Sequence, residues 1–426
     1  MRDDPAAGAG VPRPPGLWTR DLPVEAVGLW LAARKVPLAL GVGIVTRLAQ
    51  YLYDRPYWLD EGSLVANIRG LTPAGFFGPL GNSQLAPPGF LVASWAAMGA
   101  LGDSRLAIRL VPLLGGIASL FLLRAVARRC LPDRAVWLAV ALFAVANDPI
   151  YFASEAKQYS TDIAAALACT LLALTLGAGP LSAGRAAVLA ASGAAVVWCS
   201  HPAIFVLAAV GVVGLGRALA TRDGRSAGWW MAAGLAWVAS FAGVHAVAMD
   251  QLDHRGSMWA FWEFAFPPIP PRSAWDLTWP VRRIAFLFVS PLNFDAPFGP
   301  RLSMLPAFGL AILGAVRLAR ADRGRALVLM LPGGFAFLAS CLRLYPFHGR
   351  LLLFLTPTLL IAVAAGLDRV REVRGRGPAY LALLAMTLGM PAATAGYRLT
   401  APRDRDDANP VGDLRPGALD PIRFPL

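Results

Sequence analysis

Residues 106–127 read LAIRLVPLLGGIASLFLLRAVA, an apolar run whose only charged side chains are Arg109 and Arg124, near its two ends. A run of this length is typical of a helix that crosses the hydrocarbon core of a bilayer. The whole chain has the same character, because 57% of its 426 residues are hydrophobic and only 15% are charged. A soluble domain of this size could not bury that much apolar surface, so the sequence predicts an all-α polytopic membrane protein.

Apolar runs long enough to cross a membrane recur along the chain, and we expect about eleven transmembrane helices. They lie at residues 36–53, 106–127, 135–153, 161–179, 186–200, 202–219, 227–248, 303–319, 326–344, 351–367 and 378–398. A further run, Pro88 to Leu101, follows Pro87 and is too short to cross comfortably. We therefore expect it to lie flat, as an interfacial helix in a long first outer loop.

The distribution of arginine predicts the orientation of these spans. If the run from Pro88 to Leu101 lies flat, arginines collect in alternate connections, and such an excess is typical of cytoplasmic loops. The arginines concerned are Arg124, Arg128, Arg129, Arg134, Arg185, Arg217, Arg222, Arg225, Arg317, Arg320, Arg323, Arg325, Arg369, Arg371, Arg374 and Arg376. The short connections on the other side carry only Lys157 and Arg350. This bias predicts a cytoplasmic N-terminus and an outer C-terminus, and it explains the net charge of +13 without any nucleic-acid partner.

The chain is expected to have three parts. Residues 1–35 are predicted to form a cytoplasmic disordered tail, since residues 1–23 are rich in Pro, Gly and charge. Residues 36–398 are predicted to form the transmembrane core, with two long outer loops at about 54–105 and 249–302. Residues 399–426 alternate Arg with Asp and are predicted to form a short polar tail. The four cysteines lie in or at the ends of predicted spans, so no disulfide framework is implied.

Most of the unusual polar residues fall on the outer side of this threading. The adjacent carboxylates Asp60 and Glu61 follow the first span, and two such groups beside a bilayer are costly to desolvate. The other candidates on this side are Arg109, Glu155, Lys157, Tyr159, Asp162, His201, Tyr345, His348 and Arg350. Titratable groups that converge from distant connections are what an active site needs. Each also has a structural interpretation, as a hydrated loop pair, a snorkelling lysine, a helix cap or a headgroup anchor.

With these residues in view, the chain resembles the polyprenol-phosphate-sugar glycosyltransferases of the multi-pass C superfamily. It is most similar to the bacterial branch related to protein O-mannosyltransferases and to the aminoarabinose transferase of lipid A. The matching motifs, in chain order, are Trp58-Leu59-Asp60-Glu61, Ala86-Pro87-Pro88, Gly102-Asp103, Arg109-Leu110-Val111-Pro112, Ser154-Glu155-Ala156-Lys157-Gln158-Tyr159 and Tyr345-Pro346-Phe347-His348-Gly349-Arg350. The resemblance covers roughly residues 36–370. The sequence departs from the family pattern at Lys157, where arginine is common in the family, and no sizeable soluble C-terminal domain is expected.

The resemblance implies an enzyme of the bacterial inner membrane with a periplasmic active site. Family members take a sugar from a polyprenyl-phosphate carrier on the outer face and pass it to a lipid, glycan or protein acceptor, inverting the anomeric centre. The proposed general base of the family, an Asp after the first span, corresponds to Asp60. Lys157, Arg109 and Arg350 would stabilise the departing phosphate, while Glu61 would orient Asp60, bind sugar hydroxyls or hold a divalent cation. The remaining candidates for substrate binding are Glu155, Tyr159, Asp162, Tyr345 and His348.

Two other functions stay open from the sequence. A transporter or flippase for lipid-linked sugars usually carries charged residues at mid-depth, whereas the middles of the predicted spans here are almost free of charge. An outer-face ligase or polymerase of lipid-linked glycans relies on Arg and His in a late loop, which His348 and Arg350 match loosely. An acidic pair directly after the first span is not expected of the ligase or polymerase class.

Overall fold

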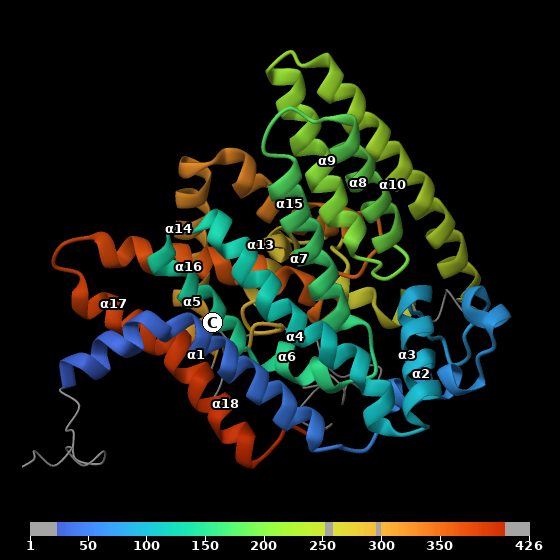
Figure 1. Ribbon diagram of the computed structural model, residues 1–426, viewed down its shortest axis with the longest axis horizontal. Helices are drawn as coiled ribbons and strands as arrows, with labels where there is room; N and C mark the ends of the chain where they lie inside the picture. Colours follow the sequence, from blue (N-terminus) through green and yellow to red (C-terminus); the bar gives the residue numbers. More distant parts are fainter. Residues whose placement is uncertain (1–23, 252–258, 295–299, 405–426) are drawn as a thin grey trace, which may run out of the picture.

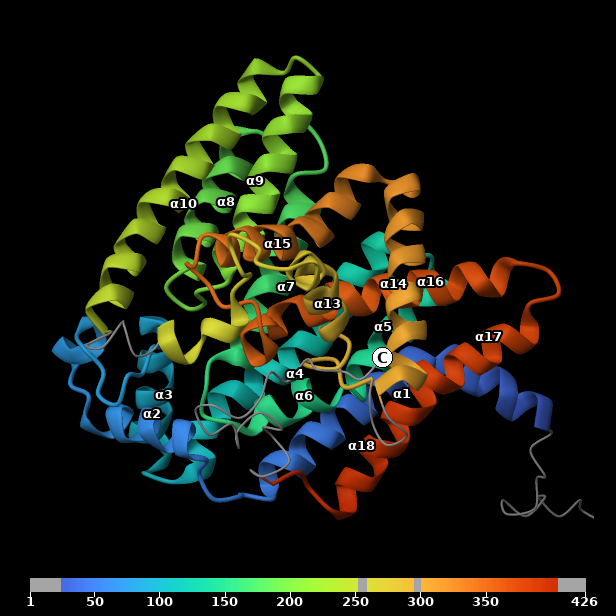
Figure 2. The ribbon, with the colours of Figure 1, turned by 180° about the vertical axis from the view of Figure 1, so that it is seen from behind.

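The computed structural model describes residues 24–251, 259–294 and 300–404. All regular secondary structure in these residues is helical (Figures 1 and 2). The first half contains α1 (Val24–Leu52), α2 (Leu59–Gly70), η1 (Pro73–Phe77), α3 (Pro88–Leu101), α4 (Arg105–Cys130), α5 (Asp133–Ala144), α6 (Asn147–Tyr151), η2 (Phe152–Ser154), α7 (Tyr159–Leu176) and α8 (Ala183–Val196). The second half contains α9 (Ala203–Ala220), α10 (Gly224–Gln251), η3 (Glu263–Ala265), α12 (Ala274–Leu277), α13 (Trp279–Phe286), α14 (Pro300–Ala321), α15 (Arg323–Cys341), η4 (Gly349–Leu355), α16 (Thr356–Glu372), α17 (Gly377–Leu384), η5 (Ala385–Gly389) and α18 (Met390–Thr400).

The number of spans is lower than the sequence predicted. In the described residues, 8 helices are long and apolar enough to cross a membrane, or up to 9 if α5 and the bent segment Asn147–Ser154 form one span. The expected eleven spans are therefore not confirmed. The run at 186–200 falls on α8, whose 14 residues rise only about 21 Å, less than the ~30 Å hydrocarbon core. The run at 36–53 falls on α1, where the buried Arg47 interrupts the apolar stretch.

The short helix expected in the first outer loop is α3, and its bounds are those of the apolar run. Pro88 occupies the first turn, where its missing N–H costs no hydrogen bond. The helix ends at Gly102, whose φ of 88° is a conformation that glycine adopts without strain. Phe90 and Leu91 are buried, and α3 packs against α2 and α4. This packing builds a small lobe beside the long helices, at one end of α10 (Figures 1 and 2).

The centre of the molecule is formed by α4, α5, α7 and α16. Packed pairs include α4 with α7, α5 with α1, and α16 with both α5 and α14. The α14–α16 pair approaches so closely that a Cβ at Gly366 would lie 2.1 Å from the carbonyl oxygen of Leu310, so only glycine fits there. On one side of this centre α8, α9 and α10 lie side by side, and on the other side lie α1, α17 and α18 (Figures 1 and 2).

The expected tails lie largely outside the described residues. Helix α1 begins at Val24, so residues 24–35 of the expected N-terminal tail are helical, and residues 1–23 are not described. Of the C-terminal tail, residues 405–426 are not described. The described part of the second outer loop contains η3, α12 and α13, and residues 252–258 and 295–299 of that loop lie outside the description.

Candidate active site

Asp60 is the meeting point of three distant segments. Its Oδ1 accepts hydrogen bonds from Lys157 Nζ at 3.0 Å and from Gln84 Nε2 at 3.2 Å. Its Oδ2 lies 2.6 Å from Arg350 Nη2. Lys157 Nζ also donates to Gln84 Oε1 at 2.6 Å, which closes a ring of three side chains. Asp60 comes from the first turn of α2, Lys157 from the connection before α7, and Arg350 from the first turn of η4.

Helix geometry gives the two adjacent carboxylates different surroundings. Both lie in the first turn of α2, where the helix dipole favours negative charge. Asp60 remains 26% exposed, whereas Glu61 is completely buried. Glu61 Oε2 accepts the backbone N–H of Trp58 at 3.3 Å, which satisfies a free donor at the start of the helix.

Glu61 lies between two buried arginines. Arg109 donates to both of its oxygens, from Nε at 2.7 Å and from Nη2 at 2.8 Å, and Arg55 Nη1 donates at 3.0 Å. The N–H of Ala156 completes the set at 2.8 Å. Arg55 and Arg109 are each only 1% exposed, so this is a buried ionic cluster. It fixes the start of α2 to α4 and to the connection that carries Lys157.

The charges around Asp60 determine its protonation state. Burial raises the pKa of Asp60, but Arg350 and Lys157 together outweigh burial and hold it well below its usual range. Burial lowers the pKa of Lys157, and the attraction of Asp60 only partly offsets this. Burial also raises the pKa of Glu61, yet the hydrogen bonds and charges of Arg109 and Arg55 give a net lowering. Asp60 and Glu61 are therefore both carboxylates at neutral pH.

Glu155 is a third buried carboxyl group beside this cluster. It is 2% exposed, and its Oε2 lies 3.6 Å from Arg55 Nη2. Its Oε1 makes no hydrogen bond with any described residue. Burial and the nearby charge of Glu61 raise the pKa of Glu155, so the protonated form is favoured there more than in water. Glu155 thus offers a polar atom that is free for a ligand.

Three further candidates come from the start of α7 and from the segment between α15 and η4. The guanidinium of Arg350 lies over the ring of Tyr159, 5.5 Å from its centre. Asp162 is buried one turn along α7, and its Oδ1 has no hydrogen-bond partner among the described residues. The hydroxyl of Tyr345 donates to the carbonyl of Leu351 at 2.7 Å, so it is already engaged by the backbone.

Neither candidate histidine, His201 or His348, forms a hydrogen bond or ion pair with Asp60 in the described part of the chain. His348 lies among aromatic rings, 5.0 Å from Phe264 and 5.4 Å from Phe286 between ring centres. Burial, with the nearby charges of Arg283 and Arg350, lowers the pKa of His348 to about 3, so its ring is neutral. Burial similarly lowers the pKa of His201 to about 4, and its electrostatic neighbour is His245.

Sequence reasoning missed several residues of this region. Gln84 contacts both Asp60 and Lys157, but no motif marks it. Arg55 was detectable, because an arginine beside the acidic pair on the predicted outer side runs against the charge bias. The ring of Tyr151 lies between two guanidinium groups, 4.4 Å from Arg55 and 4.8 Å from Arg403. Arg403 also pairs with Asp148 at 2.7 Å.

A divalent cation does not fit at Glu61. Both of its oxygens accept from guanidinium groups, which repel a metal ion. Across residues 24–251, 259–294 and 300–404, no group of three or more His, Cys, Asp or Glu side chains could hold a metal ion.

The sequence matches no protein-family model and no curated protein at a significant level. Two solved structures share the fold at TM-score 0.53: the apo oligosaccharyltransferase of Archaeoglobus fulgidus, at 12% identity, and ArnT from Cupriavidus metallidurans bound to undecaprenyl phosphate, at 17%. At these low identities the similarity is one of fold alone. The similarity covers 87% of this chain against the oligosaccharyltransferase and 86% against ArnT. It covers 72% of ArnT but only 56% of the oligosaccharyltransferase, so this chain corresponds to little more than half of the latter. Apo ArnT gives a TM-score of 0.50 at 16% identity, over 88% of this chain and 78% of ArnT.

Proposed function

We propose that this protein is an integral membrane glycosyltransferase that moves a sugar from a polyprenyl-phosphate carrier to an acceptor at the outer face of a bacterial inner membrane. The observation that carries the proposal is the pairing of Asp60 with both Lys157 and Arg350 on a GT-C fold. The carboxylate can accept the proton of the acceptor, and the two cations can stabilise a phosphate leaving group on the other side of the sugar. The ArnT structure with bound undecaprenyl phosphate supports the choice of carrier.

The reaction would be a single inverting displacement. An acceptor oxygen or nitrogen attacks C1 of the sugar and forms the new bond, while the bond from C1 to the phosphate oxygen breaks. The electron pair of that bond leaves with the polyprenyl phosphate, and the proton of the acceptor goes to Asp60. Because the leaving group is already a stable anion, the reaction needs cations at the phosphate more than it needs a general acid.

The low pKa of Asp60 implies that the donor itself activates the base. A carboxylate held by Lys157 and Arg350 accepts a proton poorly, since both cations stabilise its charged form. A donor phosphate would compete for the same two cations. As Lys157 and Arg350 turn to the phosphate, the pKa of Asp60 rises toward the value that burial favours. The base would then become effective only when the leaving group is in place.

The surrounding residues would then have separate roles. Glu61 positions the start of α2 through Arg55 and Arg109 and does not touch the substrate. The free buried oxygens of Glu155 and Asp162 are suited to sugar hydroxyls, which donate hydrogen bonds to such atoms. Arg109, tied to Glu61, would hold the site together without contacting the phosphate.

Transfer from a synthetic polyprenyl-phosphate sugar to acceptor-containing membranes tests the proposal. Asp60→Asn should lower the release of polyprenyl phosphate by about 10²–10⁴-fold, the usual contribution of a general base. Asp103→Asn is the matched control, because Asp103 belongs to the same outer loop but is 54% exposed and pairs with the exposed Arg69 at 2.9 Å. The control should keep the wild-type rate.

Other results would contradict the proposal. Full activity of an inserted Asp60→Asn protein would exclude Asp60 as the base. A wild-type protein that moves the donor across a liposome bilayer without cleaving it would be a transporter. Cleavage only of a diphosphate-linked donor would indicate the ligase or polymerase class.

A further inference from the structure

The segment that follows α18 is buried against the end of α1. Arg403 is the third residue after the end of α18, and it is only 4% exposed. The buried side-chain amide of Gln50 accepts the backbone N–H of Arg403 at 3.0 Å and donates to its carbonyl oxygen at 2.8 Å. Because one amide engages both backbone groups of the same residue, these hydrogen bonds fix where the side chain of Arg403 begins.

The side chain of Arg403 reaches from that point to α6. Its Nη1 donates to Asp148 Oδ1 at 2.7 Å, and its guanidinium lies over the ring of Tyr151, 4.8 Å from the ring centre. Asp148 is 5% exposed and Tyr151 is 1% exposed. A buried carboxylate needs a counter-charge, and an aromatic face favours a planar cation, so both contacts suit arginine better than lysine.

Tyr151 also contacts the buried cluster at Glu61. The guanidinium of Arg55 lies over the same ring, 4.4 Å from its centre, and Arg55 Nη1 donates to Glu61 at 3.0 Å. Glu61 in turn accepts the N–H of Ala156 at 2.8 Å, and Ala156 is the residue before Lys157. The contacts are therefore continuous from the C-terminal segment to the backbone that carries this lysine.

Aromatic contacts lead from the same ring to the second cation at Asp60. The ring centres of Tyr151 and Phe152 lie 5.1 Å apart, and those of Phe152 and Tyr159 lie 5.2 Å apart. Arg350 lies over Tyr159 and pairs with Asp60. Both cations that hold this carboxylate are therefore connected to one buried tyrosine.

The segment that carries Tyr151 depends on tertiary contacts for its position. Residues 147–154 form the short helices α6 and η2, bent by 62° from α5. Helices of five and three residues are not stable alone, because each makes few internal hydrogen bonds. Asn293 Oδ1 accepts the backbone N–H of Asp148 at 3.0 Å, and Arg403 adds contacts to the side chains of Asp148 and Tyr151.

We propose that Arg403 is a positioning residue of the candidate active site. Through Tyr151 and Arg55 it keeps the segment before α7 in the place where Lys157 Nζ reaches Asp60. It acts through other side chains, so it is not a catalytic group. The inference concerns the geometry around Asp60 and is independent of the reaction that the site performs.

Acylation of lysine amines in the detergent-solubilised protein, followed by peptide mass spectrometry, tests the proposal. Lys35 and Lys157 are the two lysines of the chain, and the exposed Lys35 is an internal reference. Lys157 is 4% exposed and its amine is bound by Asp60 and Gln84, so in the wild type it should react much more slowly than Lys35. Arg403→Met should raise the rate at Lys157 relative to Lys35 roughly tenfold, the effect of losing a buried cation–π contact.

Two further variants separate the parts of this support. Gln50→Met removes the hydrogen bonds to the backbone of Arg403 while the guanidinium is kept, and it should raise the rate at Lys157 by less than Arg403→Met does. Arg403→Lys keeps a charge beside Asp148 but not the planar group over Tyr151, so its rate should lie between those of the wild type and Arg403→Met.

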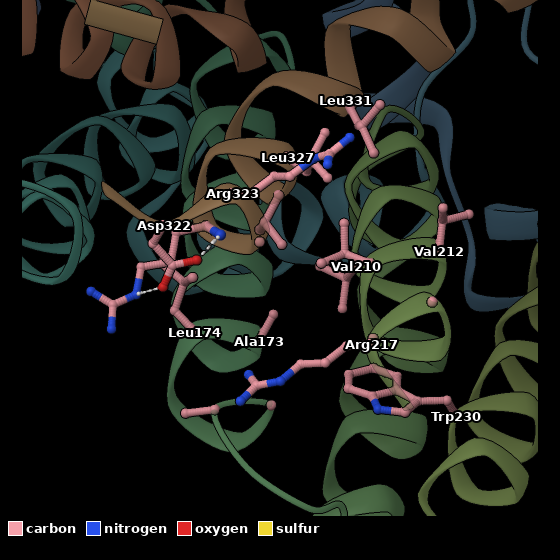
Figure 3. Close-up of a pocket in the computed structure, with 18 residues that line it drawn as sticks. Ala173, Leu174, Val210, Val212, Arg217, Trp230, Asp322, Arg323, Leu327 and Leu331 are labelled. Atoms are coloured by element: carbon pink, nitrogen blue, oxygen red, sulfur yellow. Dashed lines mark hydrogen bonds and ion pairs between the residues drawn. The ribbon is translucent and has the colours of Figure 1, made fainter. Parts of the chain in front are cut away.

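Two control variants share no residue with these contacts. Arg217→Met makes the same substitution at an exposed arginine that lines a cavity of about 570 Å³ where α7 and α9 end (Figure 3). Asp368→Asn removes the charge of a buried aspartate that pairs with Arg134 at 2.9 Å, so it lowers stability at a different site. Neither control should change the rate at Lys157 relative to Lys35.

Two results would overturn the proposal. One is a rate at Lys157 that Arg403→Met leaves unchanged, or raises no more than Asp368→Asn does at a temperature where both variants are folded. The other is equal reactivity of Lys35 and Lys157 in the wild type, because the amine would then not be held at Asp60. The labelling needs no sugar donor, so a protein that lacks transferase activity can still confirm or refute this role of Arg403.

Discussion

Replacing Glu61 by glutamine separates a structural role from a chemical one. Glutamine keeps the shape of the side chain but removes its charge and turns one acceptor oxygen into a donor. In the wild type, both oxygens accept from the guanidinium groups of Arg55 and Arg109. An amide NH₂ at this position would face other N–H donors, and two arginines that are each 1% exposed would lose their main counter-charge.

The free-energy cost of Glu61→Gln follows from general values for buried ion pairs. Removing one partner of a buried pair usually costs about 3–5 kcal/mol, because the remaining charge stays buried without compensation. The unfolding entropy of globular proteins, ~2.1 cal/mol/K per residue, amounts to ~0.9 kcal/mol/K for a chain of 426 residues. We therefore expect the Tm of Glu61→Gln to fall by about 3–6 °C.

Thermal unfolding of the purified variants in detergent measures this difference. Asp103→Asn serves as the control, because it makes the same carboxylate-to-amide change in the same outer loop at a side chain that is 54% exposed. Exposed ion pairs contribute little, so the Tm of the control should stay within about 1 °C of the wild type. If Glu61→Gln unfolds like the wild type yet has lost transfer activity, Glu61 takes part in the chemistry and the structural reasoning is wrong.

Three further outcomes are expected. The pKa of His348, about 3, lies below that of an unfolded histidine, so its contribution to stability is complete above pH ~6.5 and falls by about 1.4 kcal/mol for each pH unit below. The Tm difference between the wild type and His348→Phe should therefore be constant above that pH and change by about 1.5 °C per unit below it. Asp368→Asn should lower the Tm less than Glu61→Gln, because the buried Asp368 pairs with the partly exposed Arg134 and Arg317. Arg350→Ala should raise the KM for a polyprenyl-phosphate sugar about tenfold or more with a small change in Tm, measured by donor titration.

The sequence predicts the bounds of a helix well where particular residues mark its ends. The run from Pro88 to Leu101 becomes α3 with the same bounds, because Pro88 and Gly102 mark its ends chemically. The sequence predicted about eleven spans, whereas the described residues contain 8 or 9 helices that could cross a membrane. Apolar composition does not report whether a run continues as one helix, and α8 stops after 14 residues. Arg47 is likewise buried in α1 through hydrogen bonds to the carbonyls of Gly43 and Phe143, which no local pattern reveals.

The sequence also predicted part of the candidate site. Charge bias along the chain predicts which connections share a membrane face, and Asp60, Lys157 and Arg350 do meet. Which cation faces which carboxylate depends on tertiary packing instead. Arg109 was expected at the phosphate, yet α4 directs it to Glu61, 2.7 Å away. Gln84 joins the site through a loop whose course the sequence does not specify.

The order of the two acidic residues follows from the helix that carries them. Successive residues of an α-helix point about 100° apart, so neighbours at its first turn cannot share one environment. The first position faces the half-exposed space near Lys157 and Arg350, where a short carboxylate is held firmly by both cations. The second position faces α4, and it must reach the fork of Arg109 and the N–H of Ala156 together. An aspartate there would be one methylene too short for that span. A pair of adjacent acidic residues is thus better understood as two different groups, one partly exposed and held by Lys157 and Arg350, and one fully buried and held by Arg55 and Arg109.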